Sequence, residues 1–99
     1  MELRELLTEG HSPSVINFWL DLCHNRLKLD THTTADLLRR QLGFDVLIKS
    51  EQDGQDTLFT VSRPCHTVSW MVYASYLSRY VRDNYSQSII KRCLYLLKG

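Results

Sequence analysis

Residues 66–99 read HTVSWMVYASYLSRYVRDNYSQSIIKRCLYLLKG, and we expect the rest of the chain to pack around them. This stretch holds all five tyrosines of the chain and one of its two tryptophans. Residues 61–99 carry six Lys and Arg residues against one acid, a net charge of +5, whereas residues 1–60 carry a net charge of −4. A segment that is both aromatic and basic is either the centre of a core or a surface that meets a partner.

Two helices are predicted in this stretch. For residues 67–83, a helical wheel places one wide aromatic face on Trp70, Tyr73, Ala74, Tyr76, Leu77, Tyr80 and Val81. Val68, Met71 and Val72 lie on the other side, so the first two turns are apolar nearly all round and are expected to be buried or docked. A second helix is predicted over residues 86–98, with its outer face formed by Lys91, Arg92, Tyr95 and Lys98.

Residues 1–43 are predicted to be helical. A short helix is expected over residues 2–8 and a third one over residues 34–42, each followed by glycine. Between them, Ser12 and Pro13 begin a longer helix over residues 14–27, because serine caps a helix and proline suits its first position. Most of that helix is one broad apolar face, and its polar face carries Asn17, Asp21, His24 and Asn25, of which His24 is expected to be solvated.

The hydrophobic pattern changes to a period of two between residues 44 and 62. Residues 44–49 and 57–62 are rich in β-branched and apolar side chains, and the polar sequence SEQDGQD joins them. Asp53-Gly54 in that loop is a turn signal, so the segment is predicted to be an antiparallel hairpin. A hairpin is marginal alone in water and must pack against helices or pair with another chain.

These patterns predict an α+β fold, predominantly helical, with about five helices packed around one antiparallel β-hairpin. The length of 99 residues suits a single globular domain over residues 1–99, made of a helical part (1–43), the hairpin (44–62) and an aromatic, basic helical hairpin (66–98). No signal peptide and no membrane span are predicted. Three widely spaced cysteines are expected to be reduced thiols, which favours the cytoplasm.

No catalytic, metal-binding or cofactor-binding motif is found, so the chain is not expected to be an enzyme. Cys65 and His66 are adjacent, but neighbouring side chains rarely face each other as a nucleophile and its base must. The four histidines lack the spacing of zinc ligands, and the acidic loop lacks the calcium-binding pattern.

The function predicted instead is that of a small adaptor, inhibitor or modulator of a larger protein. Tyrosine, tryptophan and arginine dominate protein interfaces because they bury much area and keep a polar group. The predicted partner-binding residues are Trp70, Tyr73, Tyr76, Arg79, Tyr80, Arg82, Lys91, Arg92, Tyr95 and Lys98. By analogy with other small proteins that lack chemistry of their own, a phage-encoded modulator of a host nucleic-acid-processing enzyme is one setting.

The alternative is a small DNA-binding regulator of winged-helix type. A helix carrying Arg39 and Arg40 followed by a hairpin matches the order of elements in such proteins, with Lys49 as a further basic contact. The acidic hairpin loop disfavours this alternative, because the loop would repel phosphate. Nucleic acid therefore stays open as a partner, as does a second copy of the chain paired through the hairpin edge.

Overall fold

The computed structural model describes residues 13–42, 45–63 and 68–98. The elements in these ranges are the helices α2 (Pro13–Leu20), η1 (Asp21–Arg26), α3 (Thr31–Leu42), α4 (Ala74–Asn84) and α5 (Gln87–Lys98), and the strands β1 (Leu47–Asp53), β2 (Asp56–Arg63) and β3 (Val68–Tyr73). Because η1 continues α2 without a break, the described residues form four helices and one three-stranded antiparallel sheet. The predicted α+β class is confirmed, while the predicted helix over residues 2–8 lies outside the described residues.

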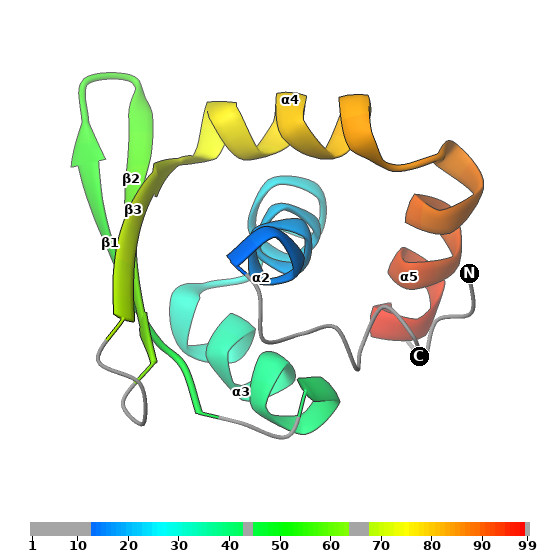
Figure 1. Ribbon diagram of the computed structural model, residues 1–99, viewed down its shortest axis with the longest axis horizontal. Coiled ribbons are helices and arrows are strands. Elements are labelled where there is room, and N and C mark those ends of the chain that lie inside the picture. Colours follow the sequence, from blue (N-terminus) through cyan, green and yellow to red (C-terminus); the bar gives the residue numbers. More distant parts are fainter. Residues whose placement is uncertain (1–12, 43–44, 64–67, 99) are drawn as a thin grey trace.

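The α2–η1 helix lies at the centre of the fold. In Figure 1 it is seen nearly end-on, with the sheet on its left, α4 above it, α5 to its right and α3 below it. Its side chains are buried nearly all round, at Val15, Ile16, Phe18, Trp19, Leu20, Asp21, Leu22 and Cys23. The prediction that helices surround a β-hairpin was therefore wrong, since the other elements surround this helix.

The polar face of the central helix is covered rather than solvated. The Asp21 carboxylate is fully buried and accepts hydrogen bonds from Asn25 Nδ2 (2.6 Å) and Arg26 Nε (3.1 Å). Asn25 Nδ2 also donates to the carbonyl oxygen of Ala74, 2.8 Å away. The half-buried His24 ring meets the Phe59 ring edge-on, with 4.7 Å between the centroids. Polar partners on the surrounding elements thus compensate for the burial of this face.

The sheet has the order β1-β2-β3, and both strand pairs are antiparallel. Strands β1 and β2 are joined by the two residues Gly54 and Gln55, and Gly54 has a φ of +64°. A positive φ at the first central residue alone defines a type II′ turn, which matches the twist of the flanking strands. The hairpin was thus predicted correctly, but most of the polar sequence expected to be a loop belongs to the strands.

The predicted helix over residues 67–83 is wrong in its first half, where the structure has strand β3. Val72 is buried and Trp70 is half-buried, whereas Ser69, Met71 and Tyr73 are exposed. This alternation is the period-two pattern of a strand at the edge of a sheet with one covered face. The apolar character on all sides of the predicted helix was the sign of this different period.

Helix α3 begins three residues before the predicted start. The carboxylate of Asp30 accepts a hydrogen bond from the backbone N–H of Thr33 (2.7 Å), the geometry of an N-cap. Asp30 therefore sets the beginning of this helix.

Helices α4 and α5 complete the core. Leu77 and Val81 of α4 and Ile90 and Cys93 of α5 are buried in the same cluster as the central helix. Phe18 of α2 stacks on Tyr85 between α4 and α5, with ring centroids 4.2 Å apart. Among the described residues, no helix is long and apolar enough to cross a membrane.

Candidate binding groove along strand β3

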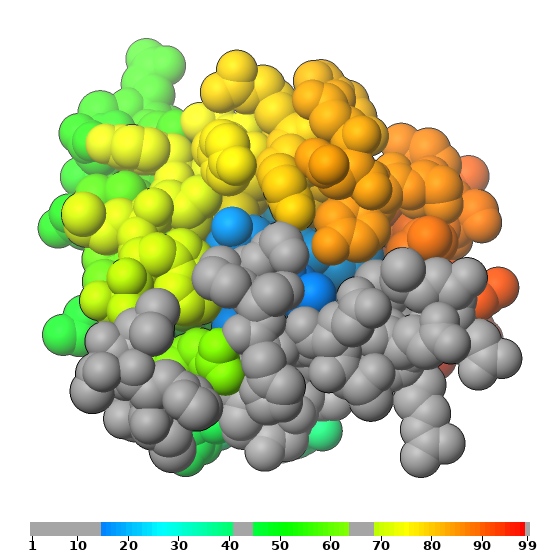
Figure 2. Space-filling view, viewed as in Figure 1, coloured from blue at the N-terminus to red at the C-terminus, as the bar shows by residue number. Residues whose placement is uncertain are grey.

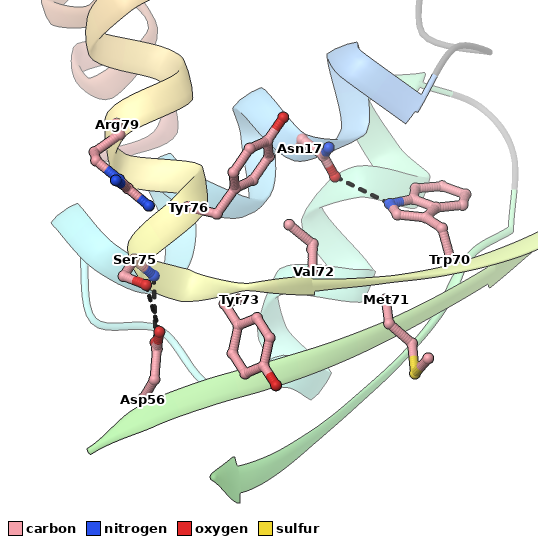
Figure 3. A pocket seen from close by; sticks show the side chains of 9 residues that line it. All are labelled: Asn17, Asp56, Trp70, Met71, Val72, Tyr73, Ser75, Tyr76 and Arg79. Carbon is pink, nitrogen blue, oxygen red and sulfur yellow. Dashed lines mark hydrogen bonds between the residues drawn. The ribbon is translucent and has the colours of Figure 1, made fainter. Parts of the chain in front are cut away.

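A groove of about 640 Å³ runs along β3, between this strand and the first turns of α4 (Figure 3). Its lining consists of Asn17, Asp56, Trp70, Met71, Val72, Tyr73, Ser75, Tyr76 and Arg79. Four consecutive strand residues, Trp70 to Tyr73, belong to it. Because side chains alternate between the two faces of a strand, a hollow that touches four in a row follows the edge of the strand.

The two faces of β3 differ in exposure along the groove. Figure 3 shows Trp70 and Val72 on the side of α2 and α4, and Met71 and Tyr73 on the other side of the strand. Trp70 is held in place because its Nε1 donates to Asn17 Oδ1, 3.0 Å away. Met71 is 69% exposed, Tyr73 42% and Tyr76 47%. Three large side chains therefore present apolar surface to solvent around one short strand.

Asp56 fixes the end of the groove where β3 passes into α4. Its carboxylate accepts hydrogen bonds from the backbone N–H of Ser75 (3.2 Å) and from the Ser75 hydroxyl. These bonds satisfy an N–H in the first turn of α4 and hold the pKa of Asp56 below its usual range, with the hydroxyl bond as the largest cause. Asp56 thus acts as the cap of a helix that begins eighteen residues later in the chain.

A second acid of the hairpin is also engaged at this end. The Tyr73 hydroxyl donates to Asp53 Oδ2 at 2.7 Å, and this bond raises the pKa of Tyr73 above its ordinary value. The carboxylates of Asp53 and Asp56 are therefore both occupied by groups of the β3–α4 junction.

Arg79 is the cation among the residues that line the groove, which it shares with the anion Asp56. It is exposed, lies one helical turn after Ser75, and takes part in none of the ion pairs that join described residues. Its guanidinium is thus available to an anionic group that enters the groove.

The aromatic surface continues along α4 beyond the groove. A smaller hollow is lined by Tyr76, Arg79, Tyr80, Asp83 and Asn84. The rings of Tyr76 and Tyr80 stack, with their centroids 6.0 Å apart. Arg82 forms an ion pair with its neighbour Asp83, with 3.2 Å between Nε and Oδ1. In Figure 2 the yellow and orange side chains of β3, α4 and the start of α5 form one continuous surface, with blue atoms of α2 visible beside it.

The ten predicted partner-binding residues fall into two groups. Trp70, Tyr73, Tyr76 and Arg79 line the groove, with Tyr80 and Arg82 further along α4. The remaining four lie on α5, on the side of the molecule away from the sheet (Figure 1), and all are exposed: Lys91, Arg92, Tyr95 and Lys98. Tyr95 is 78% exposed.

The residues predicted for DNA binding lie elsewhere. Arg39 and Arg40 are exposed near the end of α3, and Arg39 pairs with Asp36 at 2.7 Å. Lys49 is exposed on β1. The charge of Arg39 is thus already partly compensated, and the hairpin beyond it ends in acids.

Groups that could support catalysis or metal binding are few. Within residues 13–42, 45–63 and 68–98, no three His, Cys, Asp or Glu side chains are grouped as metal ligands would be. Cys23 and Cys93 are free and buried, and burial raises the pKa of each thiol to about 11. Both are therefore protonated at neutral pH and are weak nucleophiles.

Sequence reasoning missed five residues of the groove: Asn17, Asp56, Met71, Val72 and Ser75. The alternation from Ser69 to Tyr73 could have revealed that Met71 and Val72 belong to a strand. Asn17 and Trp70, which are in contact, are 53 positions apart in the chain, and Asp56 and Ser75 are 19 apart. No local sequence pattern predicts contacts over such separations.

Comparison of the chain with protein-family models, with curated proteins and with solved structures finds no match. The assignment of function therefore depends on the geometry of the groove.

Proposed function

We propose that this chain is a non-enzymatic adaptor, inhibitor or modulator that binds a larger protein through the β3 groove and the adjoining face of α4. The observation that supports the proposal is that exposed Met71, Tyr73 and Tyr76 surround a groove that also holds Arg79, which is in none of the ion pairs between described residues. Large apolar side chains beside an unpaired guanidinium are the composition of a protein-binding hot spot.

The energetics favour this groove over the α5 surface as the main contact. Tyr76 and Arg79 flank a hollow in which a partner's side chain can be desolvated, whereas Tyr95 projects from the outside of α5 at 78% exposure. Contacts in a concave, water-excluding site contribute most of an interface's free energy, and rim charges contribute little. The cations of α5 then steer the approach of an acidic partner surface.

The test is an affinity pull-down of the tagged full chain from cell lysate, with nuclease treatment and a high-salt wash, followed by mass spectrometry. We expect a stoichiometric protein partner that survives both treatments. Tyr76→Ala or Arg79→Ala should weaken its binding roughly thirtyfold, since truncating a hot-spot residue costs about 2 kcal/mol. Tyr95→Ala and Arg92→Ala are matched controls from α5 and should change binding less than about threefold.

Two outcomes would overturn the proposal. If the retained material is nucleic acid that washes off with salt, the winged-helix-like DNA-binding regulator takes its place, because phosphate contacts weaken steeply with salt. If a protein is retained but only the α5 variants release it, the groove is not the binding site. The class of target, including a host nucleic-acid-processing enzyme, is decided by the protein that is captured.

A further inference from the structure

The turn of the hairpin determines which backbone groups of β3 face the groove. In the two-residue turn, the N–H of residue 56 bonds to the C=O of residue 53, so Asp53 and Asp56 are a hydrogen-bonded pair. Such pairs alternate along an antiparallel ladder. The register continues without a bulge, so the next hydrogen-bonded pairs of β1 and β2 are Glu51 with Leu58 and Lys49 with Thr60.

The same alternation carries across to β3. Residues 59 and 61 of β2 do not bond to β1, so their N–H and C=O groups point to β3, where their partners are Val72 and Trp70. Val72 and Trp70 are therefore bonded to β2. The backbone groups of Ser69, Met71 and Tyr73 point to the opposite edge, which is the edge that the groove follows.

That edge can accept another strand. Within the part of the chain that the structure describes, β3 pairs with β2 alone. Four strand residues line the groove, a length of roughly 13 Å at about 3.3 Å per residue. The first turns of α4 and Asn17 of α2 form the other wall, so an added strand would lie between a sheet edge and a helix.

We propose that the groove binds an extended segment of the partner protein, which adds to the sheet as a strand beside β3 and places a carboxylate on Arg79. This inference rests on the proposed function and names the form of its ligand. The N–H and C=O of Met71 and the N–H of Tyr73 supply the ladder hydrogen bonds, whereas the Tyr73 carbonyl, at the N-cap of α4, accepts from the helix. Arg79 selects an acidic residue at the end of the groove nearest α4.

The walls of the groove select the other side chains of the segment. Side chains on one face of the added strand lie over Trp70, Val72 and Tyr76, and should be apolar. Those on the other face lie beside exposed Met71 and Tyr73 and border on solvent. The predicted ligand therefore alternates apolar and polar residues and carries Asp or Glu at one end.

The experiment is a selection with the purified full chain against a library of random ten-residue peptides, followed by fluorescence anisotropy with the peptide that is enriched. We expect an alternating apolar pattern with an acid at one end. Met71→Pro removes an N–H that faces the groove and should weaken binding about tenfold or more, since a strand partner loses a donor and its register. Met71→Ala loses the same side chain but keeps that N–H, so it should bind clearly better than Met71→Pro, and the difference between the two variants reports the backbone donor.

Arg79→Glu tests the carboxylate contact. It should abolish binding of the enriched peptide, and replacing the acid of the peptide with lysine should restore part of it. Near-ultraviolet circular dichroism of each variant confirms that the fold is retained.

The inference is overturned if no peptide is enriched, if the enriched peptides show helical spacing of apolar residues, or if Met71→Pro binds as Met71→Ala does. A dimer in light scattering that Met71→Pro converts to monomer would also overturn it, because a second copy would then occupy the edge.

If the pull-down partner depends on Tyr76 and Arg79 but is insensitive to Met71→Pro, strand addition fails while the proposed function stands. If peptides bind as described but no protein partner is captured, the proposed function fails alone.

Discussion

Proline placed at two neighbouring positions of β3 should have very different effects on stability. Val72 is 7% exposed, and its backbone N–H is assigned to the ladder with Phe59. Val72→Pro removes this donor and leaves a buried carbonyl oxygen of β2 without its partner, at a cost of about 1–3 kcal/mol. Distortion of the strand and poorer packing of the buried side chain add to this, so we expect a total of roughly 3–5 kcal/mol.

Met71→Pro should cost far less. The Met71 side chain is 69% exposed, and its N–H points to the groove, so the substitution breaks no ladder bond. Proline is tolerated on an edge strand where its missing N–H faces outward. The remaining cost is the adjustment of φ toward −65°, about 1 kcal/mol.

The assay is urea denaturation followed by tryptophan fluorescence. Val72→Ala is the matched control, because it shortens the buried side chain and keeps the N–H. The expected order of destabilisation is Val72→Pro, then Val72→Ala, then Met71→Pro. Amide hydrogen exchange of the unmodified chain should show strong protection at Val72 and weak protection at Met71. Equal costs for the two proline variants would refute the assignment of the free edge, and with it the strand-addition groove.

Three further predictions follow from particular residues. Burial is the main reason why the pKa of His24 lies below its ordinary value of 6.5, so the unfolded chain binds the proton more readily and stability should fall as pH drops below about 6.5. His24→Gln should reduce this fall in thermal melts, and an unchanged fall would contradict the role given to His24. Arg26→Ala should cost about 3 kcal/mol in urea denaturation, because among the described residues it leaves the Asp21 carboxylate, 1% exposed, with Asn25 as its donor. Asp21→Asn should cost less, since Arg26 is 30% exposed and reaches water, and the reverse order would contradict the assignment of this buried pair. Gly54→Ala should cost about 1–3 kcal/mol through the backbone alone, because a Cβ there meets nothing within 4 Å, whereas the positive φ at the first position of the turn disfavours any residue with a Cβ. No measurable loss in the same assay would refute the type II′ turn.

The local sequence predicted the correct secondary structure wherever its pattern was compatible with one kind of element. The apolar face after Ser12-Pro13 predicts the central helix, and Asp53-Gly54 between apolar segments predicts the hairpin. Helix α5, with its apolar stripe and exposed cations, agrees with its prediction to within one residue at its start. In these segments the backbone hydrogen bonds and the burial of one face depend on residues only a few positions apart, so the local pattern is enough to predict the element.

The tertiary structure alone decided the conformation of residues 68–73 and the position of the groove. A run such as Val68 to Tyr73 can satisfy its hydrogen bonds as a helix or as a strand, and the neighbouring edge of β2 determines which it does. The groove exists because Asn17, Asp56 and Trp70, which are distant in the chain, meet around strand β3. Its polar contacts compensate for burial only once the fold has formed, and no local residue pattern encodes contacts of that kind.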